Sequence, residues 1–228
     1  MKFKSNIKTN HPNSIFLVIV ESPSKCSKIE HFLGSNYSCI ASIGHLRQIK
    51  GLKSIDTKNN FEPTYEIIED KKDHIEKMRK LISKYNKSNI YLATDDDREG
   101  EAISWHICKL FDLPLHTKRI LFHEITKKAI LHAIENPTTI NTSLVDAQKT
   151  RQILDIIVGY KISPFLWKYL YNNKENSLSA GRCQTPALRL VYENEFQNKD
   201  LIQSHKLVGN FTSKKLLFQC NTPFEKEE

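Results

Sequence analysis

Two short apolar runs, Ile15–Val20 and Ile90–Ala93, each end on carboxylate residues. Unbroken apolar runs of this length are typical of strands that are buried on both faces of a parallel sheet. After each run the apolar residues recur every three or four positions, which predicts a helix. The sequence therefore places Glu21 and the three aspartates at 95–97 where strands lead into helices, the edge at which α/β sheets bind ligands.

Strands alternate with helices over residues 15–135. The first helix is predicted to start at Ser22 and Pro23 and to end at Gly34, from their capping preferences. Further strands are predicted at residues 37–43, 65–68 and 119–122, and further helices at 75–82, 102–111 and 126–135. This alternation predicts an α/β fold with a parallel sheet flanked by helices.

From residue 138 on, the pattern predicts mainly helix. Ser143 and Asp146 resemble a capping box at a helix start, and apolar residues at 153, 154, 157, 158 and 160 predict its inner stripe. A polar loop is expected at 168–176 and another helix through Leu188 and Tyr192. Weak alternation over 205–219 predicts a hairpin, so the chain divides into a frayed segment 1–14, an α/β domain 15–137, a helical segment 138–200 and a short terminal β segment 201–228.

The overall charge adds a candidate substrate class to this picture. The chain carries a net charge of +8 despite its acidic cluster, which fits a polyanionic partner. The five cysteines are scattered and never spaced as C-x-x-C, so neither a zinc site nor a disulfide framework is indicated. Ile15–Val20 is too short for a signal or membrane segment, and a cytoplasmic protein is expected.

The acidic cluster predicts a metal site. Five carboxylates lie within seven residues, at Asp95, Asp96, Asp97, Glu99 and Glu101. In an extended chain Asp95, Asp97 and Glu99 would point the same way and repel one another unless a cation neutralised them. Oxygen-only ligands favour Mg²⁺. The alternative is that these acids only complement the positive end of the following helix, but five of them favour a metal or phosphoryl site.

Six motifs in order along the chain resemble those of type IA DNA topoisomerases. They are L-V-I-V-E-S-P-S-K at 17–25, S-I-G-H-L-R at 42–47, A-T-D-D-D-R-E-G-E-A-I-S-W-H at 93–106, F-H-E-I-T-K-K-A-I at 122–130, D-A-Q-K-T-R-Q-I-L-D-I-I-V-G-Y-K-I-S-P-F-L-W at 146–167 and L-S-A-G-R-C-Q-T-P-A-L-R-L-V at 178–191. The resemblance implies that 15–137 is a Toprim domain, a Rossmann-like parallel sheet flanked by helices. It also implies that 138–200 is part of the helical DNA-binding core and that 201–228 begins a truncated, β-rich gate domain.

The resemblance implies a reaction and roles for the acidic site. The family transfers a DNA phosphate to a tyrosine, passes another strand and reseals the break. Glu21 would be the general acid and base, and Lys25 would stabilise charge on the phosphate. Arg98 would contact the phosphate or form a structural ion pair. Mg²⁺ would be held by Glu21, Asp95, Asp97 and Glu99.

The resemblance also implies a set of DNA contacts on the helical side. They are His45, Arg151, Gln152, Asp155, Tyr160, Trp167, Ser179, Ala180, Gly181, Arg182, Cys183 and Gln184. Backbone N–H groups of the 179–184 loop, with Arg182, would cradle a phosphate. Tyr160 and Trp167 would stack on bases, although aromatic residues beside an apolar stripe are core residues about as often.

Two departures from the family pattern bear on function. Gln152 and Ile156 stand where many bacterial members carry basic residues, so the resemblance does not imply a base preference for this chain. No tyrosine here lies in the family's G-x-I-T-Y context, so the chain alone is not expected to form the covalent intermediate. We expect the chain to be one part of a monomeric isomerase that acts on single-stranded or negatively supercoiled DNA and not at a membrane. The missing part of the enzyme would be supplied in cis or in trans. The alternatives are a non-cleaving single-strand DNA-binding module and a Toprim nuclease.

Overall fold

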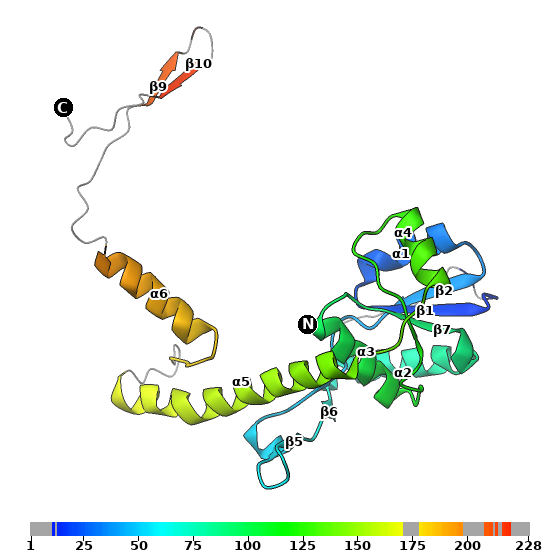
Figure 1. Ribbon diagram of the computed structural model, residues 1–228, viewed down its shortest axis with the longest axis horizontal. Helices are drawn as coiled ribbons and strands as arrows, with labels where there is room; N and C mark the ends of the chain where they lie inside the picture. The colour runs from blue at the N-terminus through cyan, green and yellow to red at the C-terminus, as the bar shows by residue number, and fades with distance from the viewer. Residues whose placement is uncertain are drawn as a thin grey trace.

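A computed structural model describes residues 11, 13–170, 178–197, 208–211, 213 and 216–219 of the chain. Its centre is a four-stranded sheet in the order β2 (Tyr37–Ala41), β1 (Phe16–Val20), β7 (Ile90–Ala93) and β8 (Lys118–Arg119). All three pairings in this sheet are parallel. Helices cover both faces (Figure 1), so the predicted α/β fold with a parallel, Toprim-like sheet is confirmed.

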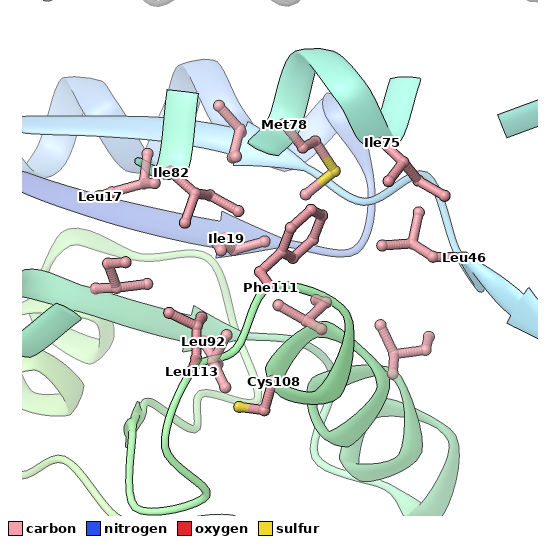
Figure 2. Close-up of a cluster of buried hydrophobic side chains, with 14 of the residues drawn as sticks. Leu17, Ile19, Leu46, Ile75, Met78, Ile82, Leu92, Cys108, Phe111 and Leu113 are labelled. Atoms are coloured by element: carbon pink, nitrogen blue, oxygen red, sulfur yellow. The ribbon is translucent and has the colours of Figure 1, made fainter. Parts of the chain in front are cut away.

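Alternate residues of β1 enter two separate cores. Leu17 and Ile19 pack in a cluster with residues of α2 (Lys72–Ile82) and α3 (Arg98–Leu110), part of which Figure 2 shows. Val18 and Val20 pack on the other face with residues of α1 (Pro23–Leu33) and α4 (Lys127–Glu135). All four β1 side chains are fully buried, and each such burial contributes about 1.5–3 kcal/mol. Burial on both faces explains why the strand is apolar throughout.

Helix ends follow the local capping residues. Pro23 begins α1, and Gly34 follows it with a φ of 82°. The Thr126 hydroxyl accepts a hydrogen bond from the Ala129 N–H at 3.3 Å and caps α4, the helix predicted at 126–135. In α3, Asp97 accepts from the Gly100 N–H at 2.7 Å. This cap starts α3 at Arg98, four residues before the predicted start.

An arm of short elements connects β2 to α2. It contains two antiparallel pairs, β3 with β6 and β4 with β5. The elements are β3 (Arg47–Gln48), η1 (Leu52–Ser54), β4 (Ile55–Asp56), β5 (Glu62–Pro63), β6 (Glu66–Ile67) and η2 (Glu69–Lys71), and η3 (Lys87–Asn89) precedes β7. The strand predicted at 65–68 is thus only two residues long, because its single partner β3 is equally short. The strand predicted at 119–122 is likewise β8, which ends at Arg119.

The helical segment begins with α5 (Thr142–Tyr169), which packs on α3 and then extends away from the sheet (Figure 1). Its 28 residues give it a length of about 42 Å. The predicted capping box at Ser143 is wrong, because the Asn141 side chain caps α5 by accepting from the N–H groups of Ser143 and Leu144. The predicted inner stripe is only partly covered, with Leu154 45% and Tyr160 56% exposed.

The remaining described elements follow α5. Helix α5 continues through Tyr169 into the polar loop predicted at 168–176, and residues 171–176 of that loop lie outside the described residues. Helix α6 (Gln184–Gln197) follows as predicted, and β9 (Val208–Phe211) pairs antiparallel with β10 (Leu216–Gln219) as the predicted hairpin. At the start of the chain, residues 1–10 and 12 are outside the description, and the Ser14 hydroxyl hydrogen-bonds to the Ser38 and Tyr85 hydroxyls. Among the described helices, none has the length and apolar content needed to cross a bilayer.

Candidate functional site

The carboxyl ends of β1 and β7 bring Glu21 next to the acidic loop. These strands are parallel neighbours, with Val20 opposite Ala93. Burial, reinforced by repulsion from the Asp95 and Asp97 carboxylates, raises the pKa of Glu21, and the nearby Lys25 only partly offsets this. The Lys25 ammonium forms an ion pair with Asp95. A carboxyl group with increased proton affinity beside a lysine is suited to moving protons at a phosphate.

Glu99 has different partners from Asp95 and Asp97. The expectation of three aligned carboxylates is wrong because it assumed an extended chain, whereas α3 begins at Arg98. The Glu99 side chain instead turns toward α5, where it accepts a hydrogen bond from Gln148 and pairs with the His45 ring. Glu99 therefore connects the acidic site to α5.

Glu101 is buried and takes part in no exposed cluster. It is 2% exposed and forms an ion pair with Arg119, which is 0% exposed, at 3.1 Å. Arg119 also donates to the carbonyls of Thr94 and Asp95, each at 2.7 Å, and Glu101 accepts from the Asn141 N–H at 3.0 Å. This buried pair fixes the backbone of the acidic loop and joins it to the start of α5. Sequence analysis placed Arg119 only in a strand, because no local pattern marks a partner 18 residues away.

Gly100 allows the first turn of α3 to approach the acidic loop. A Cβ at this position would lie 2.0 Å from the Asp95 carbonyl oxygen. The Thr94 hydroxyl donates to the Gly100 carbonyl at 2.6 Å across the same contact. Only glycine is compatible with this backbone approach. The position of Asp95 therefore depends on Gly100 as well as on Arg119.

The carboxylate oxygens at this site suit Mg²⁺ bound by few protein ligands. Among the described residues, no three His, Cys, Asp or Glu side chains are grouped tightly enough to hold a metal ion by themselves. Asp95 and Asp97 are nevertheless near enough to Glu21 to raise its pKa, after the larger effect of burial. Mg²⁺ binds through one or two carboxylates and keeps several waters. These three residues would hold it, whereas Glu99 already pairs with Gln148 and His45.

Two candidate residues differ in how the fold holds them. Arg98 is exposed and forms no hydrogen bond or ion pair within the described part of the chain.

His45 follows a loop in which Ile43 and Gly44 have φ values of 59° and 75°. A β-branched residue at positive φ is strained. The Lys71 ammonium donates to the carbonyls of Ile43 at 2.5 Å and His45 at 2.6 Å. Lys71 therefore holds the loop that presents His45.

Replacing Lys71 by methionine should lower the free energy of unfolding by about 1.5–3 kcal/mol. Methionine keeps the unbranched apolar part of the side chain but removes both charge-assisted hydrogen bonds to the strained loop. Urea unfolding followed by circular dichroism measures the change. The matched control is Lys72→Met, because Lys72 is exposed and pairs with exposed Glu69; its effect should stay below about 1 kcal/mol. Equal effects in the two variants would contradict the role of Lys71.

A buried histidine joins the arm to α3. Arg47 donates from Nε at 3.1 Å and from Nη2 at 2.9 Å to Nδ1 of His106. The guanidinium carbon also lies 5.2 Å from the ring centre of Tyr65 and 5.3 Å from that of Trp105. Burial first, and then the charge of Arg47, lower the pKa of His106 to about 3. His106 is therefore neutral. Its Nδ1 accepts the hydrogen bonds from Arg47, and its single ring proton is on Nε2.

This lowered pKa predicts that stability falls in mild acid. The unfolded chain binds a proton at His106 near pH 6.5, and the folded chain binds it only near pH 3. The contribution of His106 to the free energy of unfolding is therefore fully present above pH 6.5 and decreases as the pH falls below that value. By pH 5 the expected loss is about 2 kcal/mol. Urea unfolding at pH 7.5 and pH 5 should show this loss in the parent and a smaller one in His106→Phe. The exposed His31→Gln variant should keep the parental loss, and the same loss in His106→Phe would contradict the assignment.

A groove of about 840 Å³ runs along α5 and contains five of the twelve predicted DNA contacts. Glu99 lies among its lining residues, so the groove adjoins the acidic site through the Glu99–His45 pair. The other lining residues are Gln48, Ile49, Gln148, Arg151, Gln152, Asp155, Ile156, Gly159, Tyr160, Ser163, Pro164 and Trp167. The tertiary structure thus gathers in one concave surface five residues singled out in sequence, at positions 151, 152, 155, 160 and 167.

The loop at 178–184 packs against the far part of α5. The Ala180 N–H donates to Ser163 Oγ at 3.0 Å, and the Gly181 N–H donates to Thr185 Oγ1 at 3.2 Å. The expected phosphate cradle therefore lacks these two donors, which the protein already uses. Arg182 donates to Asp155 at 2.9 Å and so lies at the groove.

The other residues of this loop have different surroundings. Gln184 donates to Ser179 Oγ at 2.9 Å, which closes the loop on itself. The Trp167 indole N–H donates to the Leu178 carbonyl. Cys183 is exposed. Of the predicted contacts in this loop, Arg182 is thus the one whose side chain the structure ties to the groove.

Comparison with known proteins gives matches to both parts of the chain. Residues 16–125 match the Toprim domain family, and residues 139–206 match a family described as DNA topoisomerase. The structure is similar to that of full-length topoisomerase I from Thermotoga maritima, with 38% sequence identity and a TM-score of 0.71. The alignment covers 86% of this chain and 33% of that protein. The chain thus spans about a third of the length of this relative.

Proposed function

Because this chain belongs to the type IA DNA topoisomerase family, we propose that it provides the metal-binding and DNA-binding part of an enzyme that cleaves and reseals one DNA strand. The observation that carries this proposal is that a groove lined by Arg151, Tyr160 and other predicted DNA contacts reaches Glu99. Glu99 lies in the first turn of α3, which follows the acidic loop where Asp95 pairs with Lys25. The groove would hold the strand along α5. Its phosphate would reach the carboxylates near Glu99.

The residues divide the chemistry between them. Glu21 holds a proton more readily than an ordinary carboxylate and would transfer it to and from the 3′-oxygen at the break. Lys25, paired with Asp95, would stabilise negative charge on the reacting phosphate. Mg²⁺ bound at Glu21, Asp95 and Asp97 would supply further charge stabilisation. The attacking tyrosine would come from another segment, since no tyrosine in the printed sequence has the family context.

Relaxation of negatively supercoiled plasmid tests this function. The chain is assayed alone and joined to the part of the Thermotoga maritima enzyme that the alignment leaves uncovered. We expect the joined protein to relax the plasmid only with Mg²⁺, and the chain alone to leave it supercoiled. Glu21→Gln should reduce relaxation by at least about 100-fold, in the range that a positioned acid–base group contributes.

A matched control separates this effect from a general loss of charge. Glu62→Gln changes an exposed acid in the arm and should keep full activity. Relaxation by the chain alone would show that a tyrosine within these 228 residues is the nucleophile. Mg²⁺-dependent nicks with free ends would instead favour a Toprim nuclease.

A second candidate function is a single-strand DNA-binding module that does not cleave. It is favoured by the groove, which is formed within this chain by residues of α5 and the arm. This function predicts that oligonucleotide binding survives the double change Glu21→Gln and Asp95→Asn and still weakens with salt. Fluorescence anisotropy with a labelled oligonucleotide measures it. Loss of binding in the double variant would count against this candidate.

A further inference from the structure

A second hollow lies on the other side of Tyr160 from the α5 groove. It has a volume of about 710 Å³, within the range of natural ligand sites. Its walls come mainly from the arm and not from the sheet or the acidic loop. The lining residues are Lys50, Gly51, Leu52, Lys53, Ser54, Thr64, Glu66 and Tyr160.

From this hollow we infer an extended strand path. A single-stranded nucleic acid bound in the α5 groove continues past Tyr160 and over the Lys50–Ser54 loop, where its phosphates meet Lys50 and Lys53. This inference rests on the proposed function, and it adds a second subsite for the same polyanionic substrate. It makes the arm part of the binding surface.

Tyr160 connects the two hollows. Its side chain lines both the α5 groove and the second hollow. The tyrosine lies directly over the backbone at Gly51, where an added Cβ would be 2.7 Å from its hydroxyl oxygen. Because 56% of Tyr160 is exposed, its ring offers a face on which a base can stack as the strand passes. The two hollows are therefore consecutive parts of one surface.

The charges differ between the two hollows. In the α5 groove, Asp155 pairs with both Arg151 and Arg182, so the positive charges of these two arginines are partly neutralised. In the second hollow the only lining acid is Glu66, which lies 3.8 Å from the Lys50 ammonium with both side chains exposed. Such a pair is weak. Lys53 is exposed and has no ion pair among the described residues, so the hollow presents net positive charge to phosphate.

The spacing agrees with a strand several nucleotides long. Gln148, which holds Glu99, and Tyr160 are 12 residues apart on α5, a rise of about 18 Å. A short oligonucleotide near the acidic site would not reach past Tyr160. A longer one would reach the second hollow and gain its lysines. Binding should therefore depend on length.

The test measures binding of two labelled oligonucleotides, about 5 and about 15 nucleotides long, to the whole chain by fluorescence anisotropy. The parent should bind the longer one more tightly. The double variant Lys50→Ala/Lys53→Ala should weaken binding of the longer oligonucleotide about five-fold or more and leave the shorter one unchanged. The slope of log affinity against log salt should fall by about 1.4, or 0.7 for each lost phosphate contact.

Lys28→Ala/Lys58→Ala is the matched control, because it removes two exposed lysines outside both hollows and should change neither affinity. A loss of the same size in the control, or no loss for the longer oligonucleotide in the Lys50/Lys53 variant, overturns the extended path while the proposed function stands. If the parent binds neither oligonucleotide, the proposed function fails, and the extended path fails with it.

Discussion

Replacing Arg119 by methionine should destabilise the chain by about 3–5 kcal/mol. Arg119 is fully buried and its ion-pair partner Glu101 is 2% exposed. Removing one partner leaves an uncompensated carboxylate in the interior, which costs far more than a lost surface pair. The Thr94 and Asp95 carbonyls also lose a charged donor. Urea unfolding measures the change in the free energy of unfolding.

Two further variants show whether the buried charge is the cause. In Arg119→Met/Glu101→Leu both charges are gone, so the double variant should recover much of the lost stability, because apolar replacement of a whole buried pair is often neutral. Arg189→Met removes an exposed partner of Glu193 and should change stability by less than about 0.5 kcal/mol. A double variant as unstable as Arg119→Met would contradict the buried-charge explanation.

Changing Gly100 to alanine should cost about 3 kcal/mol or more and displace the acidic loop. The new Cβ would lie 2.0 Å from the Asp95 carbonyl oxygen, which is backbone and cannot rotate away. Overpacking of this kind forces a backbone shift. Since Asp95 pairs with Lys25 and raises the pKa of Glu21, the joined protein should also lose relaxation activity. Thermal unfolding and the plasmid assay measure the two effects.

Gly159→Ala provides a control with the opposite sign. Gly159 lies inside α5, and its added Cβ would meet the Ala180 carbonyl at an ordinary 4.0 Å. Alanine in a helix interior is favoured over glycine by about 0.5–1 kcal/mol, so this variant should be slightly more stable than the parent. If the two glycine variants lost similar stability, the close contact at Gly100 would not be the cause.

The elements that local pattern predicts well are those with a simple burial rule. The strand at Ile90–Ala93 was predicted with its exact bounds, because a strand buried on both faces must be apolar throughout. The helix from Pro23 was also predicted from local residues, here from their capping preferences, and the helix at 126–135 from its spacing of apolar residues. The start of α5 was misassigned, because Asn141 and Ser143 are both good capping residues and the local pattern does not choose between them; in the structure Asn141 is the cap.

The candidate site separates into predictable and unpredictable parts in the same way. The placement of Glu21 beside Asp95 follows from two strand ends at one sheet edge, which sequence periodicity reveals. The role of Gly100 has no signal in periodicity, because it depends on how closely a helix approaches a neighbouring loop. Lys71 was missed for a related reason, since its partners are backbone carbonyls in a loop far away along the chain.

The sequence by itself determined the family, the α/β order of elements and the position of the acids at the ends of strands, because these depend on local composition and spacing. Only the tertiary structure decided that the acids have different roles: Asp95 faces Lys25, Glu99 turns to α5 and Glu101 is buried against Arg119. The physical reason is that a carboxylate's role depends on its burial and on its nearest charges. Those neighbours come from distant parts of the chain and meet only when it folds.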